Sequence, residues 1–300
     1  MRHRYEVRHV TEYTYSDDVT SSYGRAFLVP RDTGEQWCRS TRLEVSPEPG
    51  HVSEHVDHYG NRTAFVEVHR PHRRLAVTCT SLVDVDRPRP DLAVLDAWTW
   101  EEAAAALPGP AAAGSTDVDP VAVRELLMPS PQIELADDVR TWAATVFTPG
   151  RPLGQALAAL VHRIFTEFRY ASGATSVTTT LLEVLAKREG VCQDFAHLAV
   201  GCLRSVGLPA RYVSGYLETE PPPGKPKLQG ADASHAWASV LVPDGRWLDL
   251  DPTNDQPADS RYVVTAWGRD YTDVPPLKGV IYTEGATSAL KVSVDVIRMA

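Results

Sequence analysis

The sequence predicts an α+β protein, with an all-β region first and a mixed region after it. Two observations indicate this class. Short segments with strand-like alternation fill residues 1–90, and from residue 136 onward a set of helical patterns is followed by strand patterns. Helices that precede a run of antiparallel strands are typical of an α+β domain. The 300 residues suffice for two ordinary domains with real hydrophobic cores.

The N-terminal region is predicted to be a small β-sandwich. Residues 4–15 alternate between apolar or aromatic side chains and charged ones, which is the pattern of a half-buried strand. Further strands, separated by turn-forming clusters, are predicted at 42–45, 63–68 and 75–85. Several short strands punctuated in this way favour a sandwich over residues 1–90.

Residues 91–135 are predicted to be a linker with helical segments, because alanine runs and Pro/Gly pairs dominate them. A second domain, the core, is predicted over 136–275 and begins with three helical patterns, at 136–147, 153–168 and 180–188. In the second of these we expect the following side chains to point inward: Leu157, Leu160, Val161, Ile164 and Phe165. Strands of the core sheet are predicted at 210–217, 234–242 and 246–251. The last strand of this sheet is predicted at 291–297, within a C-terminal strand segment that covers 276–300.

Composition excludes some classes of function. The formal net charge is −9, so an extended basic surface for nucleic acid is not indicated. No apolar run approaches the roughly 20 residues of a membrane helix, and the first residues do not form a signal-peptide pattern. Four cysteines, at 38, 79, 192 and 202, have neither metal-site nor disulfide spacing. We therefore expect a protein of the cytoplasm, where thiols stay reduced.

One cluster of metal-ligand types occurs in the N-terminal region. His51, His55 and His58 lie near Glu54, at a spacing that would suit one face of a helix. The surrounding residues predict strand and turn instead, bracketed by glycines. We therefore interpret these histidines as surface residues, and we expect neither a metal nor a cofactor.

The stretch 190–198 contains a cysteine at the start of a helix. Apolar residues recur behind it at helical spacing, as Phe195, Leu198, Ala199, Cys202, Leu203 and Val206, and Gly207 and Pro209 end the pattern. Cys192 thus falls in the first helical turn, where free N–H groups and the helix dipole favour a thiolate, the nucleophilic form. Buried cysteines commonly do no more than pack, so this stretch alone leaves catalysis and packing open.

A hairpin farther along the chain supplies a histidine and a carboxylate. Residues 242–246, with Pro and then Gly, predict a type I turn with a bulge that pairs Val242 with Arg246. Counting outward from the turn pairs Trp237 with Asp251 and makes Asp251 the diagonal neighbour of His235, with Asp249 one pair farther away. A nucleophile, a base and a group that orients the base are the components of thiol acyl transfer. The competing interpretation of the His–Asp pair is a surface hydrogen bond.

At these residues the chain resembles a known family. Its three blocks, Gly190-Val191-Cys192-Gln193-Asp194-Phe195-Ala196, Ser234-His235-Ala236-Trp237 and Asp251-Pro252-Thr253-Asn254, look like the transglutaminase-like core of the papain-like thiol enzyme superfamily. The resemblance covers about residues 140–270. The N-terminal strands, the 57–61 turn and the 268–271 segment are similar to a bacterial branch that includes proteins assigned as cysteine proteases. In that branch a small β-domain precedes the core.

The resemblance implies roles for individual residues. Cys192 matches the nucleophile, His235 the general base and acid, and Asp251 the residue that orients the histidine, which agrees with the register counted from the turn. The backbone N–H of Cys192 is expected to be one oxyanion donor. Weaker candidates for a second donor or for substrate binding are Trp237, Gln193 and Tyr170. No acidic loop matches the calcium sites of animal transglutaminases.

The expected function is thiol-dependent acyl transfer on glutamine carboxamides or peptide bonds through a Cys192 thioester. Water as the acceptor makes an amidase or peptidase, and an amine makes a transglutaminase; the motifs do not distinguish these. The expected partner is a protein or peptide substrate, with an amine as a second substrate in the transferase case. The proline-rich loop 218–230 precedes the histidine strand and is a candidate cover for the site. The alternative is a non-catalytic peptide-binding or scaffold module that uses the same groove.

Overall fold

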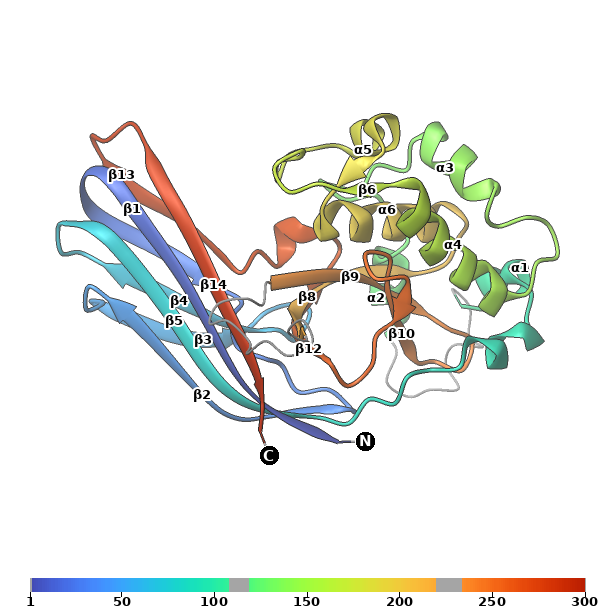
Figure 1. Ribbon diagram of the computed structural model, residues 1–300, viewed down its shortest axis with the longest axis horizontal. Helices are drawn as coiled ribbons and strands as arrows, with labels where there is room; N and C mark the ends of the chain where they lie inside the picture. Colours follow the sequence, from blue (N-terminus) through green and yellow to red (C-terminus); the bar gives the residue numbers. More distant parts are fainter. Residues whose placement is uncertain (1, 108–118, 220–233, 300) are drawn as a thin grey trace, which may run out of the picture.

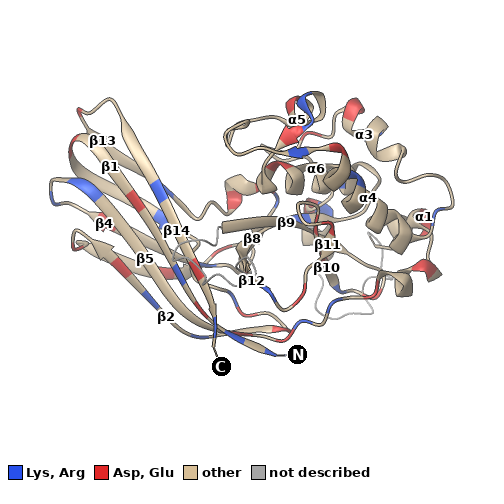
Figure 2. Ribbon diagram, in the orientation of Figure 1, with Lys and Arg blue, Asp and Glu red and all other residues tan. Residues whose placement is uncertain are grey.

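The computed structural model describes residues 2–107, 119–219 and 234–299. Figure 1 shows a strand-rich part, built around long strands near both chain termini, beside a part in which helices cover a second sheet. Lys, Arg, Asp and Glu are interspersed over both parts in this view (Figure 2). The predicted α+β class, with an N-terminal β domain and a core of helices on an antiparallel sheet, is confirmed.

A single long strand organises the N-terminal part. Strand β1 (His3–Ala26) pairs along its first half with β5 (His72–Val85) on one side and β14 (Ser288–Arg298) on the other. Along its second half it pairs with β4 (Arg62–Val68) and β13 (Leu277–Thr283). All four pairings are antiparallel, so the first and last parts of the chain belong to one sheet.

Two more strands complete this seven-stranded sheet. Strand β2 (Gln36–Ser46) pairs with β5, and β3 (His51–Val56) pairs with β4. Residues from β4 and β5, which pair with opposite halves of β1, share one hydrophobic cluster with Tyr15 and Val19. The sheet therefore curls until its two halves pack against each other, and the expected sandwich takes the form of one curled sheet.

Two expectations for the β strands are corrected. The strand predicted at 291–297 lies within β14, which pairs with β1 and not with the strands of the core. His51 and His55, whose surroundings were predicted to be strand and turn, lie on β3 and not in a turn. Pairing between strands almost 300 residues apart leaves no local pattern, since alternation shows only that a segment is a strand. Within the described ranges no three His, Cys, Asp or Glu residues form a group suited to a metal ion.

The core carries a five-stranded antiparallel sheet in the order β11-β10-β9-β8-β12. Its strands are β8 (Ala210–Leu217), β9 (Ser234–Leu241), β10 (Trp247–Asp251), β11 (Gln256–Pro257) and β12 (Tyr262–Gly268). The principal helices packed with it are α3 (Asp137–Ala144), α4 (Leu153–Glu167), α5 (Leu181–Lys187) and α6 (Cys192–Ser205). Figure 1 shows α6 lying against β9. No helix in the described ranges has both the length and the apolar content to cross a membrane.

Short elements connect the two parts and border the core. They are η1 (Leu92–Ala97), α1 (Trp100–Ala106), α2 (Pro120–Glu125), β6 (Arg169–Tyr170), β7 (Glu189–Gly190) and η3 (Tyr271–Asp273). The predicted linker with helical segments coincides with η1, α1 and α2, except for 108–118, which fall outside the described residues. Likewise, most of the predicted covering loop, from residue 220 on, lies outside them.

The two parts pack directly on each other. Tyr5 and Val7 of β1 and Val294 of β14 share a buried cluster with Tyr216 of β8 and Val263 of β12. The hydroxyl of Tyr5 donates a hydrogen bond to Glu218 Oε2 at 2.9 Å. One end of β1, with Tyr5 and Val7, thus packs against the core sheet, and the other, with Tyr15 and Val19, packs inside the curled sheet.

Helix α4 provides a test of this packing. Ile164 is fully buried in the core cluster, whereas its neighbour Phe165, which was predicted to point inward, is 48% exposed. Ile164→Ala is expected to lower the free energy of unfolding by about 2–5 kcal/mol, because it leaves a cavity that the packed helices cannot close. Urea unfolding followed by circular dichroism measures this loss.

Phe165→Ala is the matched control. It removes a larger side chain from the adjacent position and is expected to cost less than Ile164→Ala. An equal or larger loss in the control would contradict the orientation of α4.

Candidate active site

Cys192 is the first residue of α6, as the sequence predicted, and it is partly exposed. Gly190 leads into it through the short parallel pair of β7 with β6. The Asp194 carboxylate accepts hydrogen bonds from Val191 N at 2.8 Å and from Thr175 Oγ1 at 2.6 Å. A Cβ on residue 190 would lie 2.8 Å from Asp194 Oδ2, so this close approach requires glycine. Asp194 therefore fixes the backbone that presents the thiol.

The hairpin carrying His235 has the register counted from its turn. Val242 N donates to Arg246 O at 3.0 Å, and Leu241 pairs with Trp247. Gly245 has a φ of +83°, which is why the turn needs glycine there. The register brings His235 Nε2 to 2.7 Å from Asp251 Oδ2. Because Nε2 is engaged by Asp251, Nδ1 is the ring nitrogen left to face the thiol.

Asp251 is completely buried, and its carboxylate accepts several hydrogen bonds besides the one from His235. Tyr262 Oη and Asn254 Nδ2 each donate to Oδ2 at 2.6 Å, and Thr253 N donates to Oδ1 at 2.9 Å. Burial raises the pKa of this carboxyl, but the charge and hydrogen bond of His235, with those of Asn254 and Tyr262, outweigh burial and lower the pKa overall. The carboxylate is thus held ionised and fixed in orientation.

Sequence reasoning missed Tyr262 and the role of Asn254. Tyr262 comes from β12, which was not predicted, and its hydroxyl also accepts from Gln256 Nε2 at 2.8 Å. Asn254 lies in a quoted motif, where only its position three residues after Asp251 would have suggested a turn contact. Both residues hold the carboxylate, and Asn254 Nδ2 also lies 3.4 Å from His235 Nε2.

Electrostatics favour a charged imidazole. Burial lowers the pKa of His235, but the charge and hydrogen bond of Asp251, followed by a smaller contribution from Cys192, raise it to about 10. His235 is therefore protonated at neutral pH and available to pair with a thiolate. An imidazolium next to a cysteine is the arrangement that activates thiol nucleophiles.

Trp237 lies behind the histidine. Its side chain is fully buried, and its ring centroid lies 6.0 Å from that of His235 and 5.3 Å from that of Tyr262. A Cβ on residue 215 would lie 2.6 Å from the Trp237 ring, so Gly215 makes room for the indole. Trp237 therefore supports the imidazole from behind and does not line the cleft, contrary to the expectation of a substrate or oxyanion contact.

A cleft of about 330 Å³ opens over Cys192 and His235. Tyr170, which is 53% exposed, and Gln193 both line it, so these two weaker candidates are close to the thiol. The opposite wall comes from the curled sheet, through His9, Thr11 and Tyr13 of β1, Leu277 of β13 and Leu290 and Val292 of β14. Both parts of the protein therefore build the cleft.

His9 shows how the wall from the β domain is held. Tyr216 Oη donates to His9 Nδ1 at 3.1 Å, and His9 Nε2 lies 2.8 Å from Thr11 Oγ1. Burial lowers the pKa of His9 to about 4, so the ring is neutral near pH 7. His9 is a structural contact between β1 and the core sheet.

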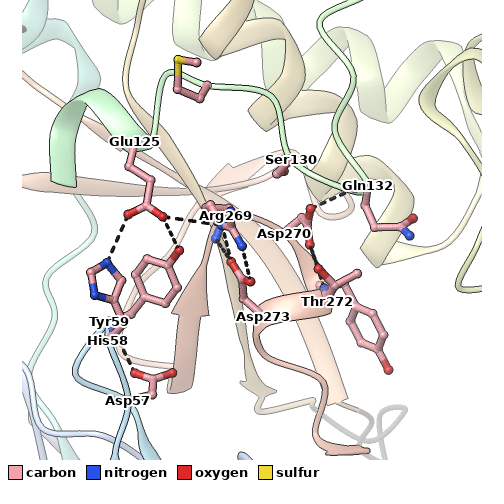
Figure 3. Close-up of polar contacts among 12 residues, drawn as sticks. Asp57, His58, Tyr59, Glu125, Ser130, Gln132, Arg269, Asp270, Thr272 and Asp273 are labelled. Atoms are coloured by element: carbon pink, nitrogen blue, oxygen red, sulfur yellow. Dashed lines mark hydrogen bonds and ion pairs between the residues drawn. The ribbon is translucent and has the colours of Figure 1, made fainter. Parts of the chain in front are cut away.

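A polar network beside the core ties together three segments (Figure 3). Glu125 of α2 accepts from Tyr59 Oη at 2.9 Å and lies 3.3 Å from His58 Nε2. Arg269 lies 3.7 Å from Glu125 and donates two hydrogen bonds to Asp273, both at 2.9 Å. The 57–61 turn and the 268–271 segment, which lie outside the core motifs, therefore both take part in the contacts that join the β domain to the core.

The same region holds one edge of the cleft. Asp270 accepts from Gln132 N at 2.9 Å, and Tyr271, which lines the cleft, donates its backbone N–H to His197 Nε2 at 3.1 Å. Burial, only partly offset by Asp270, lowers the pKa of His197 to about 4. His197 is therefore a neutral acceptor inside the core and not a second catalytic histidine.

The chain matches two family models and several known proteins. Residues 5–84 match the family model described as a bacterial transglutaminase-like N-terminal region, and residues 140–252 match the model of the transglutaminase-like superfamily. An uncharacterised protein of Mycobacterium tuberculosis is 51% identical over 303 residues, covering 98% of this chain and 93% of its own length. A Pseudomonas aeruginosa protein-glutamine gamma-glutamyltransferase is 36% identical over 104 residues, covering 32% of this chain and 15% of its own length.

Among solved structures, one from Cytophaga hutchinsonii, assigned as a cysteine protease, superposes with a TM-score of 0.78. It is 19% identical and covers 100% of this chain and 92% of its own. The whole arrangement of curled sheet and core is therefore shared with it as a fold.

The His–Asp pair generates a prediction about proton affinity. Asp251→Asn removes the charge that raises the pKa of His235, so the imidazole is expected to titrate at least one unit lower, about 1.4 kcal/mol of lost interaction. Because the pKa of His235 is higher in the folded protein than its ordinary value of 6.5, protonation of His235 stabilises the fold. This contribution is fully present below pH 6.5 and is lost as the pH rises through about 10. NMR titration of labelled histidine measures the shift.

Asp249→Asn is the control, since it removes the neighbouring carboxylate of the same strand. Asp249 lies 3.4 Å from Arg87 Nη1 and does not contact His235. If the two variants moved the His235 titration equally, the assignment of Asp251 as the orienting group would be wrong.

Proposed function

The chain belongs to the transglutaminase-like superfamily, and we propose that it catalyses thiol-dependent acyl transfer from glutamine carboxamides or peptide bonds, with Cys192 as nucleophile. The observation that carries this proposal is the 2.7 Å bond between His235 and a fully buried Asp251, at the cleft that Cys192 lines. An ordinary surface hydrogen bond does not explain a buried carboxylate with five donors around it, one of which belongs to the histidine beside the thiol.

The first half of the reaction forms a thioester. The Cys192 thiolate attacks the carbonyl carbon of the substrate, and the backbone N–H of Cys192 stabilises the oxyanion, a role that its position at the start of α6 supports. Nδ1 of the His235 imidazolium then gives its proton to the departing nitrogen. A glutamine carboxamide releases ammonia, and a peptide bond releases an amine.

The second half resolves the thioester. His235, now neutral, removes a proton from the acceptor, either water or an amine, as it attacks the thioester carbonyl. The thiolate departs and the imidazolium is restored. Asp251 holds the ring through both halves, so its function is to orient and stabilise the imidazolium.

The proposed substrate is a protein or peptide that lies in the cleft between the core and the curled sheet. The Pseudomonas relative is named as a transferase acting on protein glutamine, which supports the carboxamide as acyl donor. Leu290 and Val292 are 58% and 45% exposed on the wall opposite the thiol. An apolar side chain near the reacting carbonyl would cover them.

Removal of the nucleophile tests the reaction. Cys192→Ala is expected to abolish product formation from a glutamine peptide library, since no other thiol lines the cleft. Mass spectrometry with and without a labelled amine separates deamidation, backbone cleavage and amine incorporation. We expect deamidation without amine, because the cleft is open to water, and incorporation when amine is supplied.

Cys38→Ala is the control for the thiol, because Cys38 lies on β2, away from the cleft. It is expected to retain full activity. Turnover by Cys192→Ala at the wild-type rate would refute the proposed function.

The wall of β14 gives a separate prediction about substrate binding. Val292→Asp places a charge where the substrate is proposed to lie, so kcat/KM for peptide substrates is expected to fall about tenfold, or about 1.4 kcal/mol. The effect should appear mainly in KM. Steady-state kinetics with peptides of increasing length measures it.

Ile297→Asp is the matched control on the same strand. Ile297 is 49% exposed, similar to Val292, but it pairs with Glu6, and alternation places it on the opposite face of β14. Equal losses in both variants would show that the β14 face has no part in binding substrate.

A further inference from the structure

A second cavity lies on the face of the core sheet away from α6. Its volume is about 450 Å³, and it is bounded by the connection between β1 and β2, by residues 87–90, and by β10 and β12. It shares no lining residue with the cleft over Cys192. Nothing in the proposed acyl transfer uses it.

Arg211 of β8 is the central side chain of this cavity. Its guanidinium carbon lies 4.0 Å from the centroid of the Trp247 ring and 3.6 Å from that of Trp267. Arg211 is 7% exposed, its buried Nε has no hydrogen-bond partner, and the guanidinium forms no ion pair within the described ranges. A buried cation stacked between two indoles is costly when one of its donors, here Nε, has left water without finding an acceptor.

Other buried donors near Arg211 are also unpartnered. Ser239 lies opposite Arg211 in the strand register, and its hydroxyl has no partner in the part of the chain described. Arg87 Nη1 lies 3.4 Å from Asp249 Oδ2 but does not meet hydrogen-bond geometry. Buried polar atoms without partners are rare, so several on one sheet face need a common explanation.

Among the described residues that line the cavity, Arg211 is the cation without an ion-pair partner. Arg246 is paired with Asp244, and Arg87 with Glu35 at 3.1 Å. Asp249, the remaining carboxylate, is the one that faces Arg87. Burial lowers the pKa of Arg211 to about 9, with partial compensation from Asp249, so the group still carries its charge near pH 7.

A purely structural explanation accounts for only part of these observations. The guanidinium carbon of Arg31 lies 3.2 Å from the centroid of the Trp267 ring, so Arg31, Trp267, Arg211 and Trp247 form a stacked ladder that could serve packing alone. Arg31, however, donates to Asn61 Oδ1 at 2.5 Å and to Tyr59 O at 3.1 Å. Arg211 makes no equivalent bond and borders open volume, which a packing ladder does not require.

We propose that this cavity binds a small molecule bearing a carboxylate or phosphate, whose oxyanion accepts hydrogen bonds from Arg211 and Arg87. The planar guanidinium suits both oxyanions because it can donate two parallel bonds. Trp247 borders the cavity and offers an apolar surface to the body of the ligand. The volume is within the range of small-molecule sites.

The test is binding of defined anions to the full chain. Inorganic phosphate, acetate and benzoate, each against sodium chloride at matched ionic strength, are titrated while tryptophan fluorescence and thermal unfolding are recorded. At least one of the three oxyanions is expected to raise the melting temperature and change the fluorescence saturably, and chloride is expected to do neither. Preference for phosphate or for benzoate then distinguishes a phosphate ligand from an organic carboxylate.

Variants separate a binding site from a packing ladder. Arg211→Met is expected to weaken anion binding at least tenfold without lowering the melting temperature of the free protein, because it removes an unpaired buried charge. Should Arg211→Met fail to fold, Arg87→Gln is expected to show the same loss of binding. Arg73→Met, at an arginine 61% exposed on the β domain, is the control and should bind as the wild type does.

Two results would overturn the proposal. One is the absence of any anion-specific response in the wild type. The other is a lower melting temperature in Arg211→Met together with unchanged anion binding, which would assign Arg211 to packing alone. Neither result depends on acyl transfer, so the proposal stands or fails separately from the function of Cys192.

Discussion

Pairing of β1 with four strands is the interaction on which the rest of the molecule depends. It joins β5 and β14 to its first half and β4 and β13 to its second half, and its inner face also packs on the core sheet. Because the same face supplies Thr11 and Tyr13 to the cleft, the β domain is part of the active site. The site therefore has one wall from each part of the chain.

The chemistry of the site follows from one buried charge. Asp251 has no exposed surface, so its ionised form is stable only if neighbouring donors replace the lost water. His235, Tyr262 and Asn254 supply these donors, and Trp237 fills the space behind the imidazole. A residue that looks purely structural, such as Gly215, is then needed because the indole occupies its Cβ position.

Local sequence predicted those features that a turn or a helix start determines. The position of Cys192 in the first turn of α6 and the pairing that selects Asp251 over Asp249 both follow from glycines and apolar periodicity within a few residues. The class of the fold and the family were predicted on the same basis.

What could not be predicted depends on contacts between distant segments. Nothing near β14 indicates that its partner is β1, nothing near Tyr262 indicates that its hydroxyl meets Asp251, and periodicity placed the exposed Phe165 inside. The missing partner of Arg211 Nε in the described part of the chain could not be predicted either, because it depends on the side chains that neighbouring strands place around it.

The pairing of β1 with β13 and β14 also has a consequence for synthesis of the protein. Residues 277–298 are translated long after Cys192 and His235, yet they supply one wall of the cleft. A nascent chain whose helices have already folded still lacks that wall. β1 pairs with β13 only when residues more than 250 positions farther along the chain are available, and contacts between such distant residues form slowly. The thiol thus gains its complete surroundings only after residues 277–298 have been translated and have paired with β1.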